Sequence, residues 1–575
     1  MAGGLVGGAA FLAPHAVAAG RSPDQDDLAA VSENVAGAVG EDSPSRITIQ
    51  TIREAEKVLG VEFSDEQREV IRQTIHDQLR MVRARQVAPL PSNHFAPATS
   101  FDPRLPGYAG SPTLLERPPS WSSVDPGPLP ENEDDIAFAP VTHLSHWIRH
   151  RELSSRRLTE IYLDRLAQYD PLLDCVITRT DDLARRQADE ADRELAAGHY
   201  RGMLHGIPWG AKDLLDTAGI PTTWGAGPLQ DRVPETNAAV VRRLHEAGAV
   251  LVAKLSLGTL AYGDIWFDGE IRSPWDPRVG ASGSSGGSAA ATAAGLVGFS
   301  IGSETYGSIV SPCMRCGTVG LRPTFGRVDR TGAMALSWSI DKLGPITRTV
   351  EDSMVVLDAI AGPVGPEAAE PADLSVYDEP LGYNAYAPVD KLRVGYDPRW
   401  FDDIEARQPD SQMLNVLREL GVRMVELKWP HLPYESLQII LFAEAAGAFE
   451  RLTRTGEDAE LRWQDPTAWP NLFRRSRFLS AVDYVQTQRF RRQVMEAYDE
   501  MFHEVDLLVG PTYADWLLLS TNLTGHPALT VRTGYVDDQP HGTTFIGRLF
   551  DEGTLCQLGR QVEQHLDIWH ERPPI

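Results

Sequence analysis

Apolar residues recur every three or four positions in several segments of the chain, the spacing that one face of an α-helix produces. Between residues 47 and 85 two such segments are separated by Gly60, and the second begins at Ser64, with Gln67 placed to complete a capping box. The apolar stripe of this second helix would consist of Val70, Ile71, Ile75, Leu79 and Val82. Further helices are predicted at Leu158–Leu166, Asp181–Ala197 and Phe473–Arg492.

Short apolar runs lie between the helical segments and have the length and composition of strands. They cover Ala249–Lys254, Val297–Ile301 and Arg393–Tyr396. Strands that alternate with helices are typical of α/β proteins. With 575 residues, 42% of them hydrophobic, the chain is long enough for one large domain or two, each with a substantial core. We therefore expect an α/β fold.

The stretch from Val279 to Ile346 has the most distinctive composition. Gly280–Gly287 is a loop of Gly and Ser, and the Ala-rich run Ser288–Gly298 is predicted to be helical, with Ser288 as its cap. A second tight turn covers Glu304–Ser308. Small residues before Ser284 and Ser308 allow backbone N–H groups to approach a ligand closely.

Three interpretations of this stretch compete. A phosphate-binding loop would need Lys-Ser/Thr after the glycines, or a strand–GxGxxG–helix unit, and neither spacing is present. A flexible Gly/Ser linker does not fit with the apolar helix and strand that follow directly. The third interpretation is a serine nucleophile among backbone donors suited to an oxyanion. No His or Asp lies at a telling spacing, so its base must come from elsewhere.

A base is available upstream, in the sequence HGIPWGAKDLLDTAG. Lysine is rare in this chain, yet Lys212 stands between an apolar run and Leu214-Leu215. A desolvated lysine can lose its proton near neutral pH and then serve as a general base. The alternative is a surface lysine paired with Asp213 or Asp216, and the residues alone leave both open.

These motifs together resemble the amidase signature family, the serine hydrolases with a Ser–cis-Ser–Lys triad. The resemblance runs from about Val141 to the C-terminus and rests on GIPWGAKD, VAKLSLG, GSSGGSAAATAAG, GSETYGSI, GLRPTFGRV and LGPITRTVED. It implies a large mixed sheet covered by helices on both faces, and a cis peptide at Gly283–Ser284. It also implies catalytic roles for Lys212, Ser284 and Ser308, and an oxyanion hole formed by the N–H groups of Thr305, Tyr306, Gly307 and Ser308.

Two positions depart from the common family pattern and bear on the substrate. Tyr306 replaces the usual Gly, and a positive φ there would be unusual for Tyr. Val310 stands where many relatives have Arg, which predicts a neutral or apolar acyl group because Val cannot pair with a carboxylate. The substrate pocket is predicted to include Gly283, Val310, Trp266 and Trp338, although core packing is the alternative for each tryptophan.

The resemblance implies an amidohydrolase that cleaves a linear carboxamide through an acyl-enzyme on Ser308. One alternative is a glutaminase-like A subunit of the tRNA-dependent amidotransferase, which passes ammonia to a partner. The other is a non-catalytic binding protein on an amidase scaffold. No cofactor is implied. The expected partner is a small-molecule amide, and a homodimer stays open.

Charge and composition narrow the classes further. The formal net charge of −26 argues against nucleic-acid binding. His143, His146 and His150 share one helix face, and Cys313 and Cys316 form a CxxC pair, but neither set is completed, so no metal site is predicted. Outside the N-terminus, no apolar run is long enough for a membrane span.

The predicted organisation has four parts. Residues 1–20 resemble an export signal with an A-x-A cleavage site but without a basic start, which favours an exported protein. Residues 21–46 are predicted to be disordered. Residues 47–130 would form a helical module and a Pro-rich arm, which is either a linker or wrapped on a surface, and 131–575 the catalytic domain.

Overall fold

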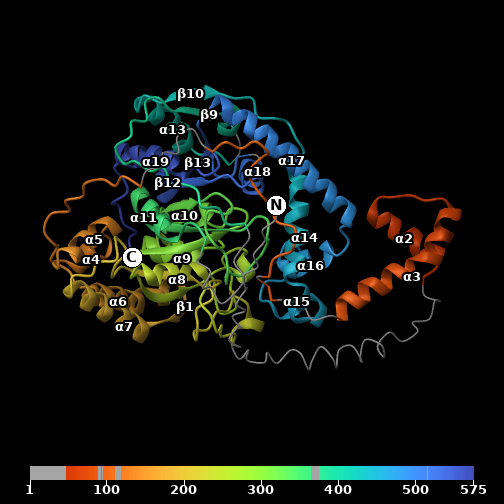
Figure 1. Cartoon of the computed structure of the whole chain (residues 1–575), viewed down its shortest axis with the longest axis horizontal. Coiled ribbons are helices and arrows are strands. Elements are labelled where there is room, and N and C mark those ends of the chain that lie inside the picture. Colours follow the sequence, from red (N-terminus) through yellow and green to blue (C-terminus); the bar gives the residue numbers. More distant parts are fainter. Residues whose placement is uncertain are drawn as a thin grey trace, which may run out of the picture. The chain divides into compact units, whose positions relative to one another are not determined.

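The computed structural model describes residues 47–87, 92–93, 95–110, 118–363, 375–402, 405–514 and 516–575 (Figure 1). The signal-like segment 1–20 and the segment 21–46 lie outside the described residues. The chain divides into two compact units, Met1–Pro91 and Ser92–Ile575. Within the described part of the chain, no helix combines the length and apolar character that crossing a membrane requires.

The first unit contains the predicted helix pair, α2 (Ile49–Leu59) and α3 (Asp65–Val87). The capping box is confirmed, since Ser64 Oγ accepts from Gln67 N at 3.3 Å and Gln67 Oε1 accepts from Ser64 N at 2.7 Å. The helices are joined by a nearly buried ion pair of 2.7 Å between Glu56 and Arg68. The predicted apolar stripe of α3 is partly exposed, with 59% of Val70 accessible to solvent.

The second unit is built on a mixed sheet of eleven strands, in the order β1-β3-β2-β6-β8-β7-β12-β13-β11-β9-β10. The bounds are β1 (Val176–Arg179), β2 (Pro208–Lys212), β3 (Val250–Leu255), β6 (Phe299–Glu304), β7 (Val319–Arg322), β8 (Lys342–Thr347), β9 (Arg393–Tyr396), β10 (Arg423–Glu426), β11 (Leu507–Pro511), β12 (Ala528–Val536) and β13 (Gln539–Gly547). A separate two-stranded sheet pairs β4 (Arg272–Ser273) with β5 (Asp276–Gly280).

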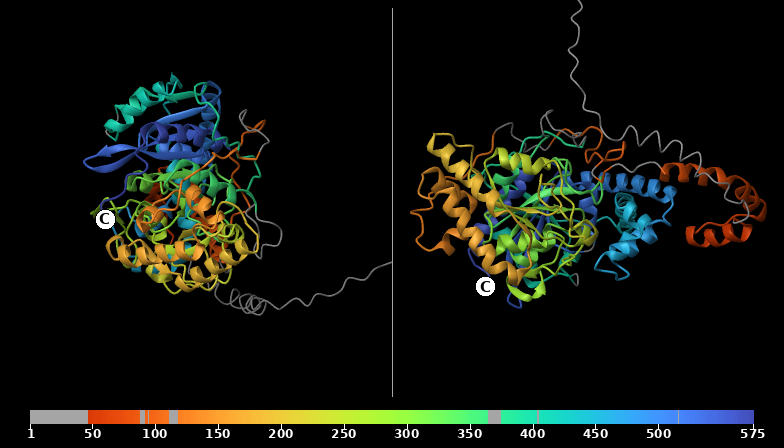
Figure 2. Two further views of the ribbon diagram at one scale, coloured as in Figure 1. Left: turned by 90° about the vertical axis from the view of Figure 1, so that its left-hand side faces the viewer. Right: turned by 90° about the horizontal axis from the view of Figure 1, so that it is seen from below.

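Helices cover both faces of the large sheet (Figure 2). Every residue of β2, β3, β6, β8 and β11 is buried, as expected for strands that are covered on both sides. The helices are α4 (Glu133–Ala137), α5 (Val141–Arg149), α6 (Ser155–Leu173), α7 (Asp181–Ala196), α8 (Ala239–Glu246), α9 (Gly286–Ala293), α10 (Val310–Cys316), α11 (Val350–Ile360), α12 (Pro398–Phe401), α13 (Gln408–Glu419), α14 (Gln438–Ala448), α15 (Glu450–Thr455), α16 (Trp469–Ser476), α17 (Ala481–Glu504), α18 (Leu517–Thr524) and α19 (Glu552–Leu566). The predicted α/β fold with a large mixed sheet is confirmed.

Two predicted helices differ from the structure in their bounds. Helix α9 begins at Gly286, and Ser288 lies inside it, donating from Oγ to the Ile301 carbonyl at 3.1 Å instead of capping the helix. The glycines are required by close packing, since a Cβ at Gly287 would lie 2.4 Å from the Ser256 carbonyl oxygen. The predicted helix 473–492 is interrupted, because Ser480 caps a new helix by accepting from Asp483 N at 3.0 Å.

The Pro-rich arm packs on the second unit in its described parts. Asn93 exchanges hydrogen bonds with the backbone of Ala335, at 2.9 and 2.7 Å, and the Phe101 ring contacts Phe325 edge-on at 5.1 Å between centroids. Ser122 donates to Glu351 from both its backbone and its hydroxyl, each at 2.6 Å. Residues 92–93, 95–110 and 118–130 therefore belong to the compact unit that carries the sheet.

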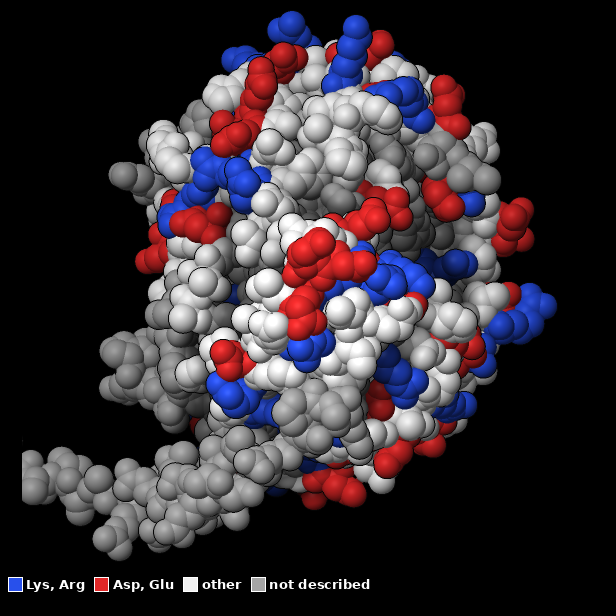
Figure 3. All heavy atoms as spheres, turned by 90° about the vertical axis from the view of Figure 1, so that its right-hand side faces the viewer, with Lys and Arg blue, Asp and Glu red and all other residues white. Residues whose placement is uncertain are grey.

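Charged side chains of both signs are mixed on one face of the molecule despite the acidic composition (Figure 3). Lys and Arg lie among Asp and Glu on the face that Figure 3 shows. No large patch of a single sign dominates the described residues of this face (Figure 3), although the formal net charge of the chain is −26.

Candidate active site

Lys212 ends strand β2, and its amine lies within a group of serine hydroxyls. Its Nζ is 2.8 Å from each of Ser284 Oγ, Ser285 Oγ and Ser303 Oγ, and the residue is fully buried. Burial lowers the pKa of Lys212 well below its usual range, and the fields of Asp341 and Glu304 oppose this shift only in part. Burial therefore favours the neutral form of the amine.

The hydrogen bonds around this amine allow its neutral form to accept a proton from a serine hydroxyl. A neutral amine has two N–H donors and one lone pair, so one of its three hydroxyl neighbours must donate to it. Ser285 Oγ instead donates to the Ser303 carbonyl at 3.1 Å. The lone pair is thus left for the hydroxyl of Ser284 or Ser303.

The alternative of a surface Lys212 paired with Asp213 or Asp216 does not agree with this geometry. Asp213 is paired with Lys254 at 3.0 Å, and both side chains are fully buried. Lys254 lies opposite Ala211 in the parallel pairing of β2 with β3. Because side chains alternate along a strand, Lys212 and Lys254 project to opposite faces of the sheet.

The two serine turns lie in direct contact. The Ser308 carbonyl accepts a hydrogen bond from Ser285 N at 3.1 Å. The predicted cis peptide at Gly283–Ser284 is confirmed. A side chain at position 283 is excluded, since a Cβ there would lie 1.8 Å from the Gly263 carbonyl oxygen. Lys212, Ser284 and the turn that carries Ser308 are thereby brought together from β2, the α9 entry and the β6–α10 connection.

The predicted oxyanion loop has free backbone donors. Among the hydrogen bonds of the described residues, none uses the N–H groups of Tyr306, Gly307 or Ser308. Gly307 has φ of 86°, a conformation that favours glycine, whereas Tyr306 does not adopt a positive φ. The replacement of the usual Gly by Tyr306 therefore causes no backbone conflict, and 38% of the Tyr306 side chain stays exposed.

Glu304, which the sequence indicates only as part of the turn, holds this loop from beneath. Its Oε2 accepts from Ile309 N at 2.8 Å and from Val310 N at 3.0 Å, and its Oε1 accepts from Arg322 at 2.8 Å and from Asn522 at 2.9 Å. Burial opposes the charge of Glu304, but Arg322 and the hydrogen bonds outweigh it and lower its pKa. Glu304 thus fixes the backbone that follows Ser308.

Replacing Glu304 by Gln is expected to destabilise the protein by about 3 kcal/mol, because one partner of a buried ion pair is removed. All four partners of Glu304 are donors, so the amide nitrogen of Gln would face donors at one end. Chemical denaturation measures the change. The matched control is Glu496→Gln in the exposed pair with Arg492, for which a loss below about 0.5 kcal/mol is expected. Equal losses in the two variants would contradict a structural role for Glu304.

The predicted pocket residues have different environments. Val310 is fully buried and Trp266 is 4% exposed, packed edge-on against Phe267 at 4.8 Å. Trp338 is half-buried and donates from Nε1 to the Asn93 carbonyl at 3.0 Å. In this conformation Val310 and Trp266 lie in the core, so their contact with substrate stays a prediction.

Three hydroxyl groups lie in a line near the turn that carries Ser308, and the sequence does not indicate this arrangement. Ser282 Oγ lies 2.6 Å from Ser311 Oγ, which in turn contacts the Tyr513 hydroxyl. Tyr513 is 38% exposed, and burial of its hydroxyl raises its pKa. These neutral groups offer hydrogen bonds to a polar substrate and no charge.

The histidines and cysteines singled out in the sequence do not form a metal cluster in the described part of the chain. No group of three or more His, Cys, Asp or Glu side chains arranged for a metal occurs among the residues that the structure describes. The His146 and His150 rings stack on each other at 4.1 Å. Cys313 and Cys316 are free and buried, and burial raises the pKa of Cys313 to about 12.

Comparison with known proteins agrees with this geometry. Residues 157–519 match the family model described as Amidase. The chain is 34% identical over 484 residues to the A subunit of glutamyl-tRNA(Gln) amidotransferase from Halorhodospira halophila, covering 76% of this chain and 98% of that protein. The structure of the native peptide amidase of Stenotrophomonas maltophilia superposes with a TM-score of 0.66 and 30% identity, covering 76% of this chain and 98% of that one. An amidase family protein of Bacillus anthracis superposes with a TM-score of 0.67 and 25% identity, covering 77% and 93%. The chain therefore belongs to the amidase signature family.

Proposed function

We propose that this chain is an amidohydrolase that cleaves a linear carboxamide through an acyl-enzyme on Ser308. The observation that carries the proposal is the buried amine of Lys212, 2.8 Å from the Ser284 hydroxyl. Ser284 follows directly on the cis bond, and its neighbour Ser285 contacts the Ser308 turn. In this proposal Lys212 is the base, Ser284 the relay hydroxyl and Ser308 the nucleophile, and one proton passes between them.

In the first half of the reaction, Ser308 Oγ attacks the carbonyl carbon while its proton passes to Ser284 Oγ and the Ser284 proton passes to Lys212. The oxyanion accepts hydrogen bonds from the free N–H groups of the 306–308 loop. Return of a proton from Lys212 through Ser284 to the nitrogen releases ammonia or an amine and leaves the acyl ester. Water then repeats the cycle and releases the carboxylic acid.

A second candidate function shares this chemistry and differs in the fate of the nitrogen. The chain covers 98% of the length of the A subunit of glutamyl-tRNA(Gln) amidotransferase from Halorhodospira halophila at 34% identity, and this similarity favours a glutaminase that supplies ammonia to a partner. The peptide amidase likeness favours free hydrolysis. A role with aminoacyl-tRNA would also count against the export predicted from residues 1–20.

The two candidates are separated by assaying the full chain alone. Ammonia release is measured with glutamine, asparagine and a series of neutral linear amides, and Ser308→Ala serves as the blank. Turnover of neutral amides well above that of glutamine supports the free amidohydrolase. Glutamine turnover that is slow alone and rises when a partner protein is added supports the second candidate. Ammonia release by Ser308→Ala equal to that of the parent would refute both.

Neutral acyl groups are expected to react better than groups that carry a carboxylate. The hydroxyl line of Ser282, Ser311 and Tyr513 bears no charge, and Val310 replaces the arginine common in relatives. A carboxylate would have to be desolvated without a cation, so butyramide should exceed succinamate in kcat/KM by about tenfold or more. Steady-state kinetics on this pair tests the expectation, and a preference for succinamate would reverse it.

A further inference from the structure

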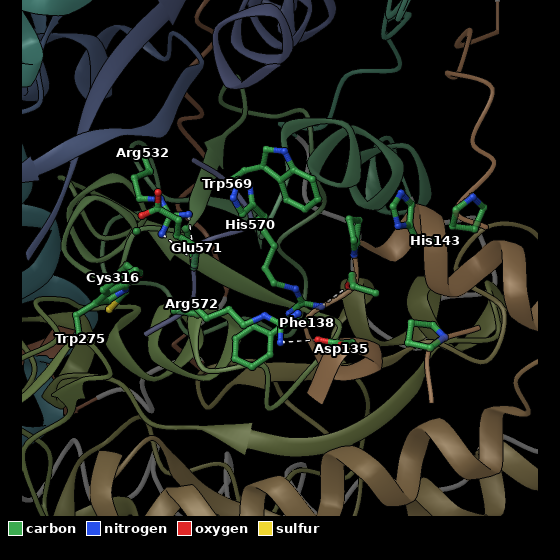
Figure 4. Close-up of a pocket in the computed structure, with 18 of the residues that line it drawn as sticks. Asp135, Phe138, His143, Trp275, Cys316, Arg532, Trp569, His570, Glu571 and Arg572 are labelled. Atoms are coloured by element: carbon green, nitrogen blue, oxygen red, sulfur yellow. Dashed lines mark hydrogen bonds and ion pairs between the residues drawn. The ribbon is translucent and has the colours of Figure 1, made fainter. Parts of the chain in front are cut away.

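A cavity of about 240 Å³ opens in the sheet-bearing unit, and it shares no lining residue with the cluster of Lys212, Ser284 and Ser308. Helices α4 and α5, the β4–β5 turn, the end of α10, strand β12 and the C-terminal segment contribute to its wall (Figure 4). The residues that matter for its chemistry are Phe138, Trp275, Trp569, Arg348, Arg532 and Arg572. Three aromatic rings and three guanidinium groups thus face one small space.

Two of these arginines lack a carboxylate partner among the described residues. Arg532 is 8% exposed and donates only to backbone carbonyls, from Nη1 to Glu571 at 3.2 Å and from Nη2 to Ile568 and Glu571. Arg348 donates to the carbonyls of Val297 and Ala139, both at 2.8 Å, and more weakly to the Thr292 carbonyl at 3.2 Å and the Tyr162 hydroxyl at 3.4 Å. The Nε atom of each guanidinium is buried and has no hydrogen-bond partner.

The acidic side chains at this wall are already engaged. Asp135 pairs with Arg572 at 2.9 Å, and Glu571 accepts from the Tyr535 hydroxyl. Burial lowers the pKa of His143 and so favours its neutral form. The three arginines of the lining thus outnumber its two carboxylates, Asp135 and Glu571, so the cavity wall carries an excess of positive charge. Burial lowers the pKa of Arg532, and the charges of Glu571 and Glu563 oppose this shift only in part.

The aromatic residues define the shape of what would fit beside these cations. Trp275 donates from Nε1 to the Cys316 carbonyl at 2.8 Å, which fixes its ring, and the Arg532 guanidinium lies 5.3 Å from that ring. The Arg572 guanidinium covers Phe138 at 4.7 Å. Flat surfaces of this kind favour an offset or edge-on aromatic ring.

From the unpaired guanidinium groups and the aromatic walls, we infer that this cavity is a binding site for a small aromatic carboxylate. A carboxylate accepts charge-assisted hydrogen bonds from a guanidinium, and Arg532 lines the cavity with its Nη atoms bonded to backbone carbonyls instead of a carboxylate. An apolar cavity of about 150 Å³ holds a benzene molecule, so about 240 Å³ accommodates one ring or two fused rings with the acid group.

The site is separate from the proposed catalytic centre. Helix α10 begins two residues after Ser308 and ends at Cys316, which lines the cavity. At about 1.5 Å per residue, this helix holds the two sites roughly 10 Å apart along its axis. A ligand here would therefore not occupy the acyl pocket, and its binding should survive loss of the nucleophile.

Calorimetric titration of the full-length Ser308→Ala chain with 2-naphthoate tests the inference, because this variant excludes turnover. We expect saturable binding at one site, and at least tenfold weaker binding of the neutral analogue 2-naphthalenemethanol. Arg532→Gln should weaken 2-naphthoate binding by about tenfold or more, since a charge-assisted pair is lost. The control Arg492→Gln, in an exposed pair, should leave the affinity unchanged. Equal affinity for the alcohol, or no binding, would overturn the inference.

A labelling experiment covers the case in which Arg532→Gln fails to fold. Photolysis of the unaltered chain with 4-benzoylbenzoate, followed by peptide mapping, should mark the segments that contain Trp275 or Trp569. Excess 2-naphthoate should suppress this label. Label found only around Ser308 and Tyr513 would show that aromatic acids bind at the catalytic centre and would contradict a separate site.

Discussion

Ser308→Ala is expected to abolish amide turnover, with kcat falling by a factor on the order of 10⁴ to 10⁶, the range seen when a serine nucleophile is removed. The side chain is only 7% exposed and ends a turn fixed by Glu304, so removing its hydroxyl takes away the bond-forming atom without opening the fold. Ammonia release under saturating substrate measures the loss, and an unchanged melting temperature shows that the fold is retained.

Covalent labelling gives an independent measurement of the same assignment. A fluorophosphonate should modify Ser308 in the parent and nothing in Ser308→Ala. The variant Ser284→Ala should lose less activity, because water can bridge to Lys212. Modification of another serine, or full activity in Ser308→Ala, would remove Ser308 from the mechanism.

Lys212→Arg is the second change with a large expected effect, a loss of about 10³-fold or more in kcat at neutral pH. Guanidinium keeps the positive charge but cannot accept a proton, and its fork does not fit among three hydroxyls each 2.8 Å from the amine. The exposed lysine at position 391 provides the matched control, and Lys391→Arg should keep parental activity. Near-parental turnover by Lys212→Arg would make Lys212 a structural cation.

The pH–rate profile of the parent tests the protonation state of the same residue. Burial lowers the pKa of Lys212, and only the neutral amine accepts the proton of Ser284. The rate should therefore rise with pH through that lowered pKa and stay level above it. Lys212→Ala should lack this rise and recover partly at high pH, where hydroxide replaces the base. A parental rate that stays constant as the pH falls into the acid range would contradict a neutral lysine.

The alternation of helices and strands was sufficient to predict the α/β class. The pairing of Lys212 with Ser284 followed only from the resemblance to the amidase signature family, because the two residues lie 72 positions apart and the residues alone left the role of Lys212 open. The motifs did not reveal Ser285 and Ser303 as partners of the amine. Which hydroxyl of a serine-rich loop faces a lysine depends on side-chain direction, set by packing of glycines such as Gly287 against the Ser256 carbonyl.

Long-range contacts explain the other differences. Tyr513 reaches Ser311 across 202 residues of sequence, and no local pattern records such a contact. Val310 is fully buried and its N–H donates to Glu304 at 3.0 Å, and a comparison of side-chain types at that position reveals neither fact. The sequence does contain a signal for the interruption before α17, since Ser480 and Asp483 have the spacing of a helix cap.

The neutral amine inside the serine cluster also makes folding a proton-releasing reaction. In the unfolded chain Lys212 has its ordinary pKa of 10.5, and in the folded protein that pKa is well below this value. Between the two values the unfolded state binds more protons, so the free energy of unfolding that depends on Lys212 increases with pH. Below the ordinary pKa of lysine the fold thus gives up stability because this side chain is buried, and the protein should unfold more readily as the pH falls toward the lowered pKa.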